Sequence, residues 1–229
     1  MEFELKSRMK SGTFDVTVIN VRPGFKLYIQ AVIDNYSRYV LAWRVTDKIN
    51  AENTIESIKL AHQKASALLD TNASTEVMMD PGKENDNHQV KNFISSKNLK
   101  RVLAQVDIHF SNSMVERLFH SLKNNFLYHQ NINGIEDLTR KANFYFSQHN
   151  NFIPLAIHRG GTPAEIYQSK WNAEEELKLK EGRDVALQIR KQKNMSQCEK
   201  CPISDMPTNF SAVQVNADNV TNEQKAQAS

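Results

Sequence analysis

The chain has 229 residues, of which 40% are hydrophobic and 24% charged, and its formal net charge is +3. This length can bury the core of one main domain with smaller additions, and the composition is that of a soluble globular protein. Two cysteines exclude a disulfide-rich scaffold, no stretch is long and apolar enough to span a bilayer, and the N-terminus lacks the pattern of a signal peptide. We therefore expect a protein of the reducing cytoplasm.

The first half of the chain predicts a meander of three strands followed by a helix and a fourth strand. Runs of β-branched and aromatic residues, separated by turns at 22–24 and 35–37, indicate the strands, and apolar residues at helical spacing indicate the helix. The expected strands are 13–20, 26–34, 38–45 and 75–79, and the expected helix is 51–69.

The second half predicts mostly helices. We expect a helix ending near residue 97, a strand at 100–104, a helix opening around Ser113, a helix at 136–148, a short turn of helix at 164–167 and a charged helix at 171–192. The order of the elements predicts an α/β fold with a mixed five-stranded sheet and flanking helices. The expected division is an extension at 1–12, a core at 13–168, a charged helix at 169–193 and a disordered polar tail at 194–229.

Three acidic residues are the candidate site. Asp15 interrupts an apolar strand, Asp80 follows a buried strand, and Glu116 opens a helix with Lys123 two turns further on the same face. Carboxylates gathered from two strand ends and a helix can hold two divalent metals, which is the apparatus for cutting or joining phosphodiesters.

Each acid also has a simpler interpretation. Asp15 fits a surface strand residue, Asp80 fits a turn before Pro81-Gly82, and Ser113 with Glu116 fits a capping box. Asp34, at the end of the second strand, is interpreted as a turn cap outside the site. Together the three acids favour the metal site, because no simpler interpretation predicts all of them within their surrounding motifs.

These residues carry a resemblance that covers about residues 13–168. In order along the chain, Asp15-Val-Thr17, Val32-Ile-Asp-Asn-Tyr-Ser-Arg38, Asp80-Pro-Gly82, Ser111-Asn-Ser-Met-Val-Glu116 and Thr162-Pro-Ala-Glu-Ile-Tyr167 resemble the motifs of the retroviral-integrase and DDE-transposase superfamily, especially bacterial insertion-sequence transposases. The pattern departs from the family at Gly12, where a Trp is common, and after Asn150, where an Arg and a His are missing.

The resemblance implies an RNase H-like fold, two Mg²⁺ or Mn²⁺ ions, and DNA cleavage followed by strand transfer in transposition and recombination. It implies that Asp15 bridges both metals while Asp80 and Glu116 each hold one. Lys123 is then a candidate phosphate contact, and His120 and Lys83 are further candidates for binding DNA. Double-stranded DNA at element ends and target, a homo-oligomer, and a bacterial cytoplasmic, nucleoid-associated location are the expected partners and setting.

Several alternatives stay open at this stage. Only twelve residues precede Thr13, so we expect the end-recognising helix-turn-helix to be missing, or to come from an upstream segment or a separate protein. A nuclease of the same fold, and a transposition-impaired remnant that still binds DNA or other subunits, are the competing functions. A basic flank formed by Lys83, Lys91, Lys97, Lys100 and Arg101, and half a zinc site at Cys198-x-x-Cys201, are weaker candidates.

Overall fold

The computed structural model describes residues 11–67, 75–82, 85–103 and 113–198. The chain divides into two compact units, Met1–Lys180 and Glu181–Ser229. The sheet and the helices that cover it belong to the first unit, and the described part of the second unit is the remainder of one long helix.

A mixed five-stranded sheet forms the centre of the first unit, in the strand order β3-β2-β1-β4-β5. Antiparallel pairing joins β1 to β2 and β2 to β3, whereas β1 pairs with β4 and β4 with β5 in parallel. This arrangement confirms the predicted fold class. The strands are β1 (Ser11–Arg22), β2 (Phe25–Asp34), β3 (Val40–Thr46), β4 (Thr75–Met79) and β5 (Leu99–Leu103).

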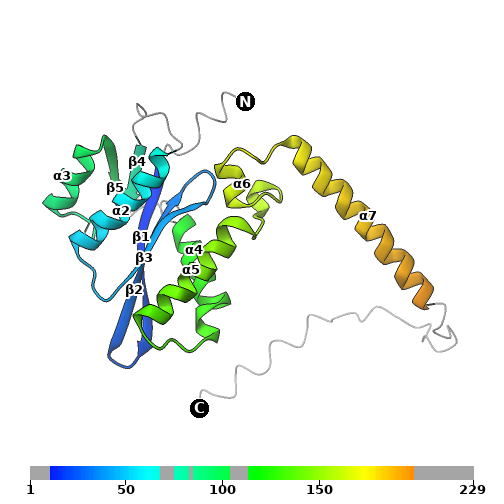
Figure 1. Ribbon diagram of the computed structural model, residues 1–229, viewed down its shortest axis with the longest axis horizontal. Helices are drawn as coiled ribbons and strands as arrows, with labels where there is room; N and C mark the ends of the chain where they lie inside the picture. Colours follow the sequence, from blue (N-terminus) through cyan, green and yellow to red (C-terminus); the bar gives the residue numbers. More distant parts are fainter. Residues whose placement is uncertain (1–10, 68–74, 83–84, 104–112, 199–229) are drawn as a thin grey trace, which may run out of the picture. The chain divides into compact units, whose positions relative to one another are not determined.

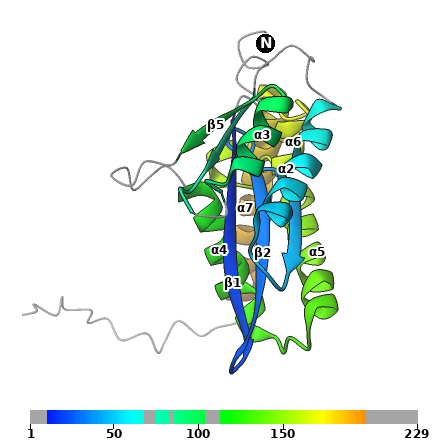
Figure 2. The ribbon, with the colours of Figure 1, turned by 90° about the vertical axis from the view of Figure 1, so that its left-hand side faces the viewer.

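Helices cover both faces of the sheet. Figure 1 shows α2 and α3 on one side of the strands and α4 and α5 on the other, and Figure 2 is turned so that α2 and α3 face the viewer. The connections include two short 3₁₀ helices, η1 and η2. The bounds are α2 (Ala51–Ser66), α3 (His88–Ser96), α4 (Ser113–Asn125), η1 (Leu127–His129), α5 (Ile135–Asn151), η2 (Ala156–His158) and α6 (Pro163–Tyr167).

The alternation of side chains along β1 separates two hydrophobic clusters. Phe14 and the partly buried Val16 belong to the cluster under α2 and α3, whereas Ile19 belongs to the cluster under α4 and α5. Because successive strand residues point to opposite faces, the odd-numbered positions of β1, including Asp15, face α4 and α5. The sheet therefore turns Asp15 towards the helix that carries Glu116.

The last helix is longer than expected. α7 runs from Ala173 to Cys198, past the predicted end at Gln192, so residues 194–198 are helical although they were expected in the polar tail. The physical reason is visible in the sequence, since no proline or glycine occurs between Gly182 and Pro202 to stop the helix.

The third strand begins later than predicted, at Val40 rather than Arg38. Arg38 has a φ of 64°, which keeps it in the turn after β2. The side chain of Asn150, near the end of α5, then fixes the start of β3. Its Oδ1 accepts a hydrogen bond from the backbone N–H of Val40 (2.8 Å), and its Nδ2 donates to the carbonyl oxygen of the same residue (3.1 Å).

We predict that Asn150→Ala destabilises the first unit by about 1–3 kcal/mol, because a buried N–H and a buried carbonyl lose their partner. Urea denaturation followed by circular dichroism measures the change. Asn151→Ala is the matched control, since Asn151 is exposed and its side chain bonds only within α5, to the Ser147 carbonyl. Equal stabilities of the two variants would contradict the role given to Asn150.

Candidate catalytic carboxylate site

The pairing of β1 with β4 aligns the two aspartates. Gly12 lies opposite Val77, and Thr13 lies opposite Met78. Asp15 and Asp80 each follow two positions later, so they continue the same parallel register, Asp80 as the first residue after β4. Residues opposite each other in parallel strands point to the same face. Both carboxylates therefore lie on the side of the sheet that α4 covers.

Glu116 comes from the first turn of α4 and is exposed. Val115, Leu118, Phe119 and Leu122 bury the opposite side of this helix against the sheet. The apolar face of α4 thus fixes the direction in which Glu116 projects.

The electrostatics of Asp15 show that it lies within reach of both other carboxylates. The pKa of Asp15 is raised to about 7, mainly because burial disfavours the charged carboxylate, and further because of the negative charges of Asp80 and Glu116. A hydrogen bond of 2.7 Å from the backbone N–H of Val16 to Oδ1, and the charge of Lys123, act in the opposite direction. Four predicted residues thus share one electrostatic environment.

Lys123 takes part in this environment from the second turn beyond Glu116. Burial lowers the pKa of its ammonium group, and the charge of Asp15 raises it. Lys123 is half-buried on α4, unlike the exposed His120 between it and Glu116. Lys123 is therefore a positive charge that favours the ionised form of Asp15. No ion pair within 4.0 Å joins the two among the described residues.

The donor set has the chemistry of a site for a hard divalent cation. Mg²⁺ and Mn²⁺ prefer carboxylate oxygens, and a dication would offset both the burial and the repulsion from Asp80 and Glu116 that raise the pKa of Asp15. Within the described ranges, no three side chains of His, Cys, Asp or Glu are gathered closely enough to hold a metal as they stand. The carboxylates interact through their charges but do not surround a common point.

Asn85 supports the segment that carries Asp80, and no pattern in the sequence pointed to this role. It is buried, its Nδ2 donates to the carbonyl oxygen of Asp80 (3.1 Å), and its backbone N–H donates to the carbonyl oxygen of Gly82 (2.9 Å). These bonds close the turn after β4. A lone asparagine five residues after an aspartate is too common a pattern to have been recognised in advance.

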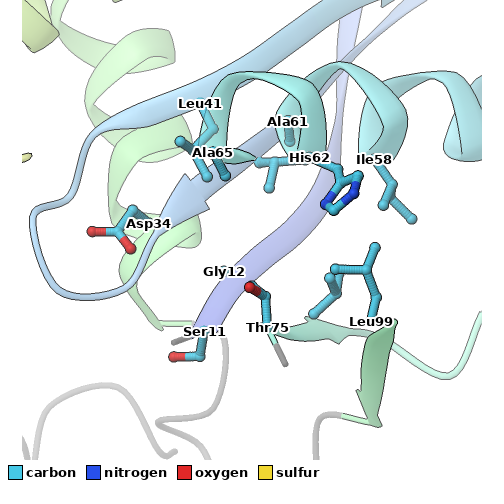
Figure 3. A pocket seen from close by; sticks show the side chains of 12 residues that line it. Ser11, Gly12, Asp34, Leu41, Ile58, Ala61, His62, Ala65, Thr75 and Leu99 are labelled. Atoms are coloured by element: carbon cyan, nitrogen blue, oxygen red, sulfur yellow. The ribbon is translucent and has the colours of Figure 1, made fainter. Parts of the chain in front are cut away.

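Asp34 lies apart from this site, as expected. It is buried at the end of β2, and its Oδ2 accepts hydrogen bonds from the backbone N–H and the hydroxyl of Ser37 (2.7 and 2.6 Å). The predicted turn cap is confirmed. Figure 3 shows Asp34 at the edge of a small apolar cavity of about 30 Å³ beneath α2, roughly the room of one water. This cavity lies on the other face of the sheet from Asp15.

The weaker candidates have other partners or fall outside the described ranges. Lys91 and Arg101 both pair with Asp86 (2.8 and 2.9 Å), and Lys100 pairs with Glu76 (2.8 Å), so these three charges of the expected basic flank are already engaged. Lys83, Ser111, Asn112 and Cys201 lie outside the described residues, and Cys198 is the last residue of α7.

The five-stranded mixed sheet and its flanking helices have the RNase H-like fold of integrase catalytic cores. Among solved structures, the chain is similar to the HTLV-2 integrase catalytic core domain in complex with magnesium (TM-score 0.52, 18% identity, 70% of this chain and 97% of that chain). It is also similar to the catalytic core domain of BIV integrase (TM-score 0.51, 18% identity, 71% of this chain and 95% of that chain).

A larger assembly gives a similar match. A chain of the simian T-cell lymphotropic virus intasome, in complex with PP2A regulatory subunit B56 gamma, matches with a TM-score of 0.56 at 15% identity over 69% of this chain, but only 54% of the intasome chain is covered. At identities this low the likeness defines the fold. No protein-family model matches the chain, and no curated protein matches it.

The described helices include none that is both long and apolar enough to cross a membrane.

We predict opposite shifts of the Asp15 pKa in two variants of α4. Glu116→Gln removes a negative charge and lowers the pKa from about 7, whereas Lys123→Met removes a positive charge and raises it. Carboxyl ¹³C NMR of the metal-free protein measures both shifts. Shifts of the same sign, or none, would contradict the shared environment.

The same pKa predicts a pH-dependent stability. Because the folded-state pKa of about 7 lies above the unfolded value of about 3.9, folding binds a proton at Asp15. The stability that this proton contributes to the folded state is fully present below the unfolded pKa and is lost as the pH rises through about 7. As the pH rises between those two pKa values, Asp15→Asn should therefore become more stable relative to the unsubstituted chain.

Proposed function

We propose that this chain is the catalytic core of a DDE-type transposase or integrase, and that it cleaves DNA and transfers the cut strand to a target. In this proposal Asp15, Asp80 and Glu116 hold two Mg²⁺ or Mn²⁺ ions, Asp15 contacting both. When bound, such ions stabilise the charge that develops on the attacking and leaving oxygens of a phosphodiester.

One observation carries the proposal more than any other. The β1–β4 register and the packing of α4 bring three separate acidic motifs to one face of the sheet, and their charges act on Asp15. The simpler interpretations of the three acids predict no such convergence. The fold shared with integrase catalytic cores, one of which was solved in complex with magnesium, supports the same chemistry.

The side chains around the carboxylates have defined tasks in this proposal. Asp15 must lose its proton before it can bind a cation, so its raised pKa makes the empty site bind cations better as the pH rises through about 7. Lys123 favours the ionised form of Asp15 and is available to contact a DNA phosphate. His120, exposed one turn after Glu116, and Lys83 are further candidates for binding the DNA backbone.

Double-stranded DNA is the proposed substrate, as element end and as target. The joining of two ends requires more than one core, so we propose that the chain acts as a homo-oligomer; the HTLV-2 integrase core domain has been solved in dimeric and trimeric forms. A helix-turn-helix from an upstream segment or a separate protein would select the ends. A bacterial nucleoid is the proposed setting.

We predict that Asp80→Asn reduces Mg²⁺-dependent DNA cleavage at least about 100-fold without unfolding the chain, because the loss of one ligand removes several kcal/mol of charge stabilisation. Cleavage of a labelled duplex and a circular-dichroism melt measure the two quantities. Asp86→Asn is the matched control, since Asp86 lies in the same segment but is exposed and paired with Lys91 and Arg101.

Retained cleavage by Asp80→Asn would remove the assignment of the three acids. A pre-cut DNA end separates the remaining possibilities. Cleavage without joining by the unsubstituted chain would identify a nuclease of the same fold, and DNA binding with neither reaction would identify a remnant.

We also predict weak DNA binding with little sequence preference and strong salt sensitivity. The proposed contacts go to phosphates, which are the same in every sequence, and each contact releases counterions. Fluorescence anisotropy with unrelated duplexes over a series of salt concentrations measures this. Tight binding specific to one end sequence by this chain alone would contradict the prediction.

A further inference from the structure

The turn between β2 and β3 presents Arg38 in a fixed conformation. The carboxylate of Asp34 closes this turn by accepting two hydrogen bonds from Ser37. The backbone N–H of Arg38 also donates to the carbonyl oxygen of Asp34 (2.9 Å). Arg38 itself has a φ of 64°, which an arginine adopts only where its surroundings hold it.

Two histidines hold the same turn from the other side. Nε2 of His149, at the end of α5, donates to the carbonyl oxygen of Arg38 (3.0 Å), and Nε2 of His158, in η2, donates to that of Ser37 (2.8 Å). A carbonyl can only accept, so each ring carries its proton on Nε2. Burial lowers the pKa of both imidazoles, so they are neutral near pH 7. The turn is therefore clamped by uncharged donors.

The side chain of Arg38 lines a cleft of about 540 Å³ beside the start of α4. Its Nη1 contacts Sδ of Met114, and Arg117 lies one turn further along the same helix. Hydroxyl groups and apolar side chains from α4, α5 and the segment 153–157 complete the lining, among them Ser113, Ser121, Tyr145, Leu155 and Ile157. The cleft thus carries two guanidinium groups on a partly apolar floor.

Neither guanidinium has a carboxylate partner within 4.0 Å among the residues that the structure describes. In contrast, Arg101, Arg140 and Arg159 each form an ion pair there. Asp34 acts on Arg38 only at longer range, and partial burial lowers the pKa of the Arg38 guanidinium. The Met114 sulfur is a weak acceptor and does not offset the cost of partly burying a charge. An anion in the cleft would offset it.

We propose that Arg38 and Arg117 form a phosphate-binding subsite for DNA, next to the proposed carboxylate site. This inference rests on the proposed function. Arg117 directly follows Glu116, and Met114, which Arg38 contacts, precedes it by two residues. The start of α4 thus carries Glu116 and also lines the cleft, so a DNA strand that crosses this end of the helix can reach both. The planar fork of a guanidinium matches the oxygens of a phosphodiester.

The subsite would position the strand without reading its sequence. The carboxylates alone repel a phosphate backbone, so cations beside them are needed to hold it in place. Because the turn around Arg38 is clamped by Asp34, His149 and His158, little conformational entropy of its backbone is lost when the phosphate binds.

The test measures duplex DNA binding by fluorescence anisotropy over a series of salt concentrations. Arg38→Gln and Arg117→Gln should each weaken binding and lower the slope of log affinity against log salt by about one, and the double variant by about two. Arg38→Lys keeps the charge and should keep the slope. Arg22→Gln is the control, because Arg22 lies at the far end of β1, exposed beside Phe25, and should change neither quantity.

The outcomes separate the two proposals. Unchanged slopes in both glutamine variants while the unsubstituted chain binds DNA would overturn the subsite alone, and so would an equal loss in the Arg22→Gln control. Absence of DNA binding by the unsubstituted chain would overturn the proposed function and the subsite with it. Should Arg38→Gln fail to fold, Arg117→Gln decides, since Arg117 is exposed.

Discussion

The parallel register between β1 and β4 is the constraint on which the rest of the site depends. It brings Asp15 beside Asp80, the residue that follows β4. Because side chains alternate between the two faces of the sheet, both aspartates point towards α4. A shift of one residue in this pairing would send one carboxylate to the opposite face. The hydrophobic residues Phe14, Val77 and Met79 on that opposite face hold the register, because a slip would expose them.

A second constraint joins the C-terminal part of the core to the sheet. Asn150 and His149 at the end of α5, and His158 in η2, all bond to backbone atoms between Ser37 and Val40. The buried Tyr167 of α6 stacks on Tyr39 of the same region, with ring centroids 4.5 Å apart. Motifs far apart in the sequence therefore meet at one turn. This turn fixes the position of Arg38, as the sheet register fixes the position of Asp15.

Local patterns in the sequence predicted most of the fold. Strand alternation and turn residues gave β1, β2 and β4, and the apolar spacing of Val115, Leu118 and Leu122 gave α4 with Glu116 on its free side. The ends were less predictable. Arg38 was assigned to a strand because β-propensity says nothing about a turn conformation that is imposed by α5 and η2.

The site was predictable in its residue types but not in its surroundings. Asp15, Asp80 and Glu116 could be proposed because their motifs have a recognisable order, and Asp34 could be set aside as a turn cap. The ion pairs of Asp86, the bond from Asn85 to the Asp80 carbonyl and the meeting of Arg38 and Arg117 at one cleft depend on long-range packing. A single sequence contains no local signal for such contacts, so the ion pairs of Lys91 and Arg101 within the expected basic flank could not be predicted.

The proposed function requires Asp15, Asp80 and Glu116 to hold divalent metal together. Anomalous diffraction from a crystal of this chain soaked in Mn²⁺ tests it most directly. We expect Mn²⁺ bound to a carboxylate oxygen of Asp15 and shared with Asp80 or Glu116, at the distances of about 2.0–2.6 Å usual for hard cations and oxygen ligands. Manganese found only elsewhere on the chain, with these carboxylates free of metal at saturating Mn²⁺ and a pH well above 7, would contradict it.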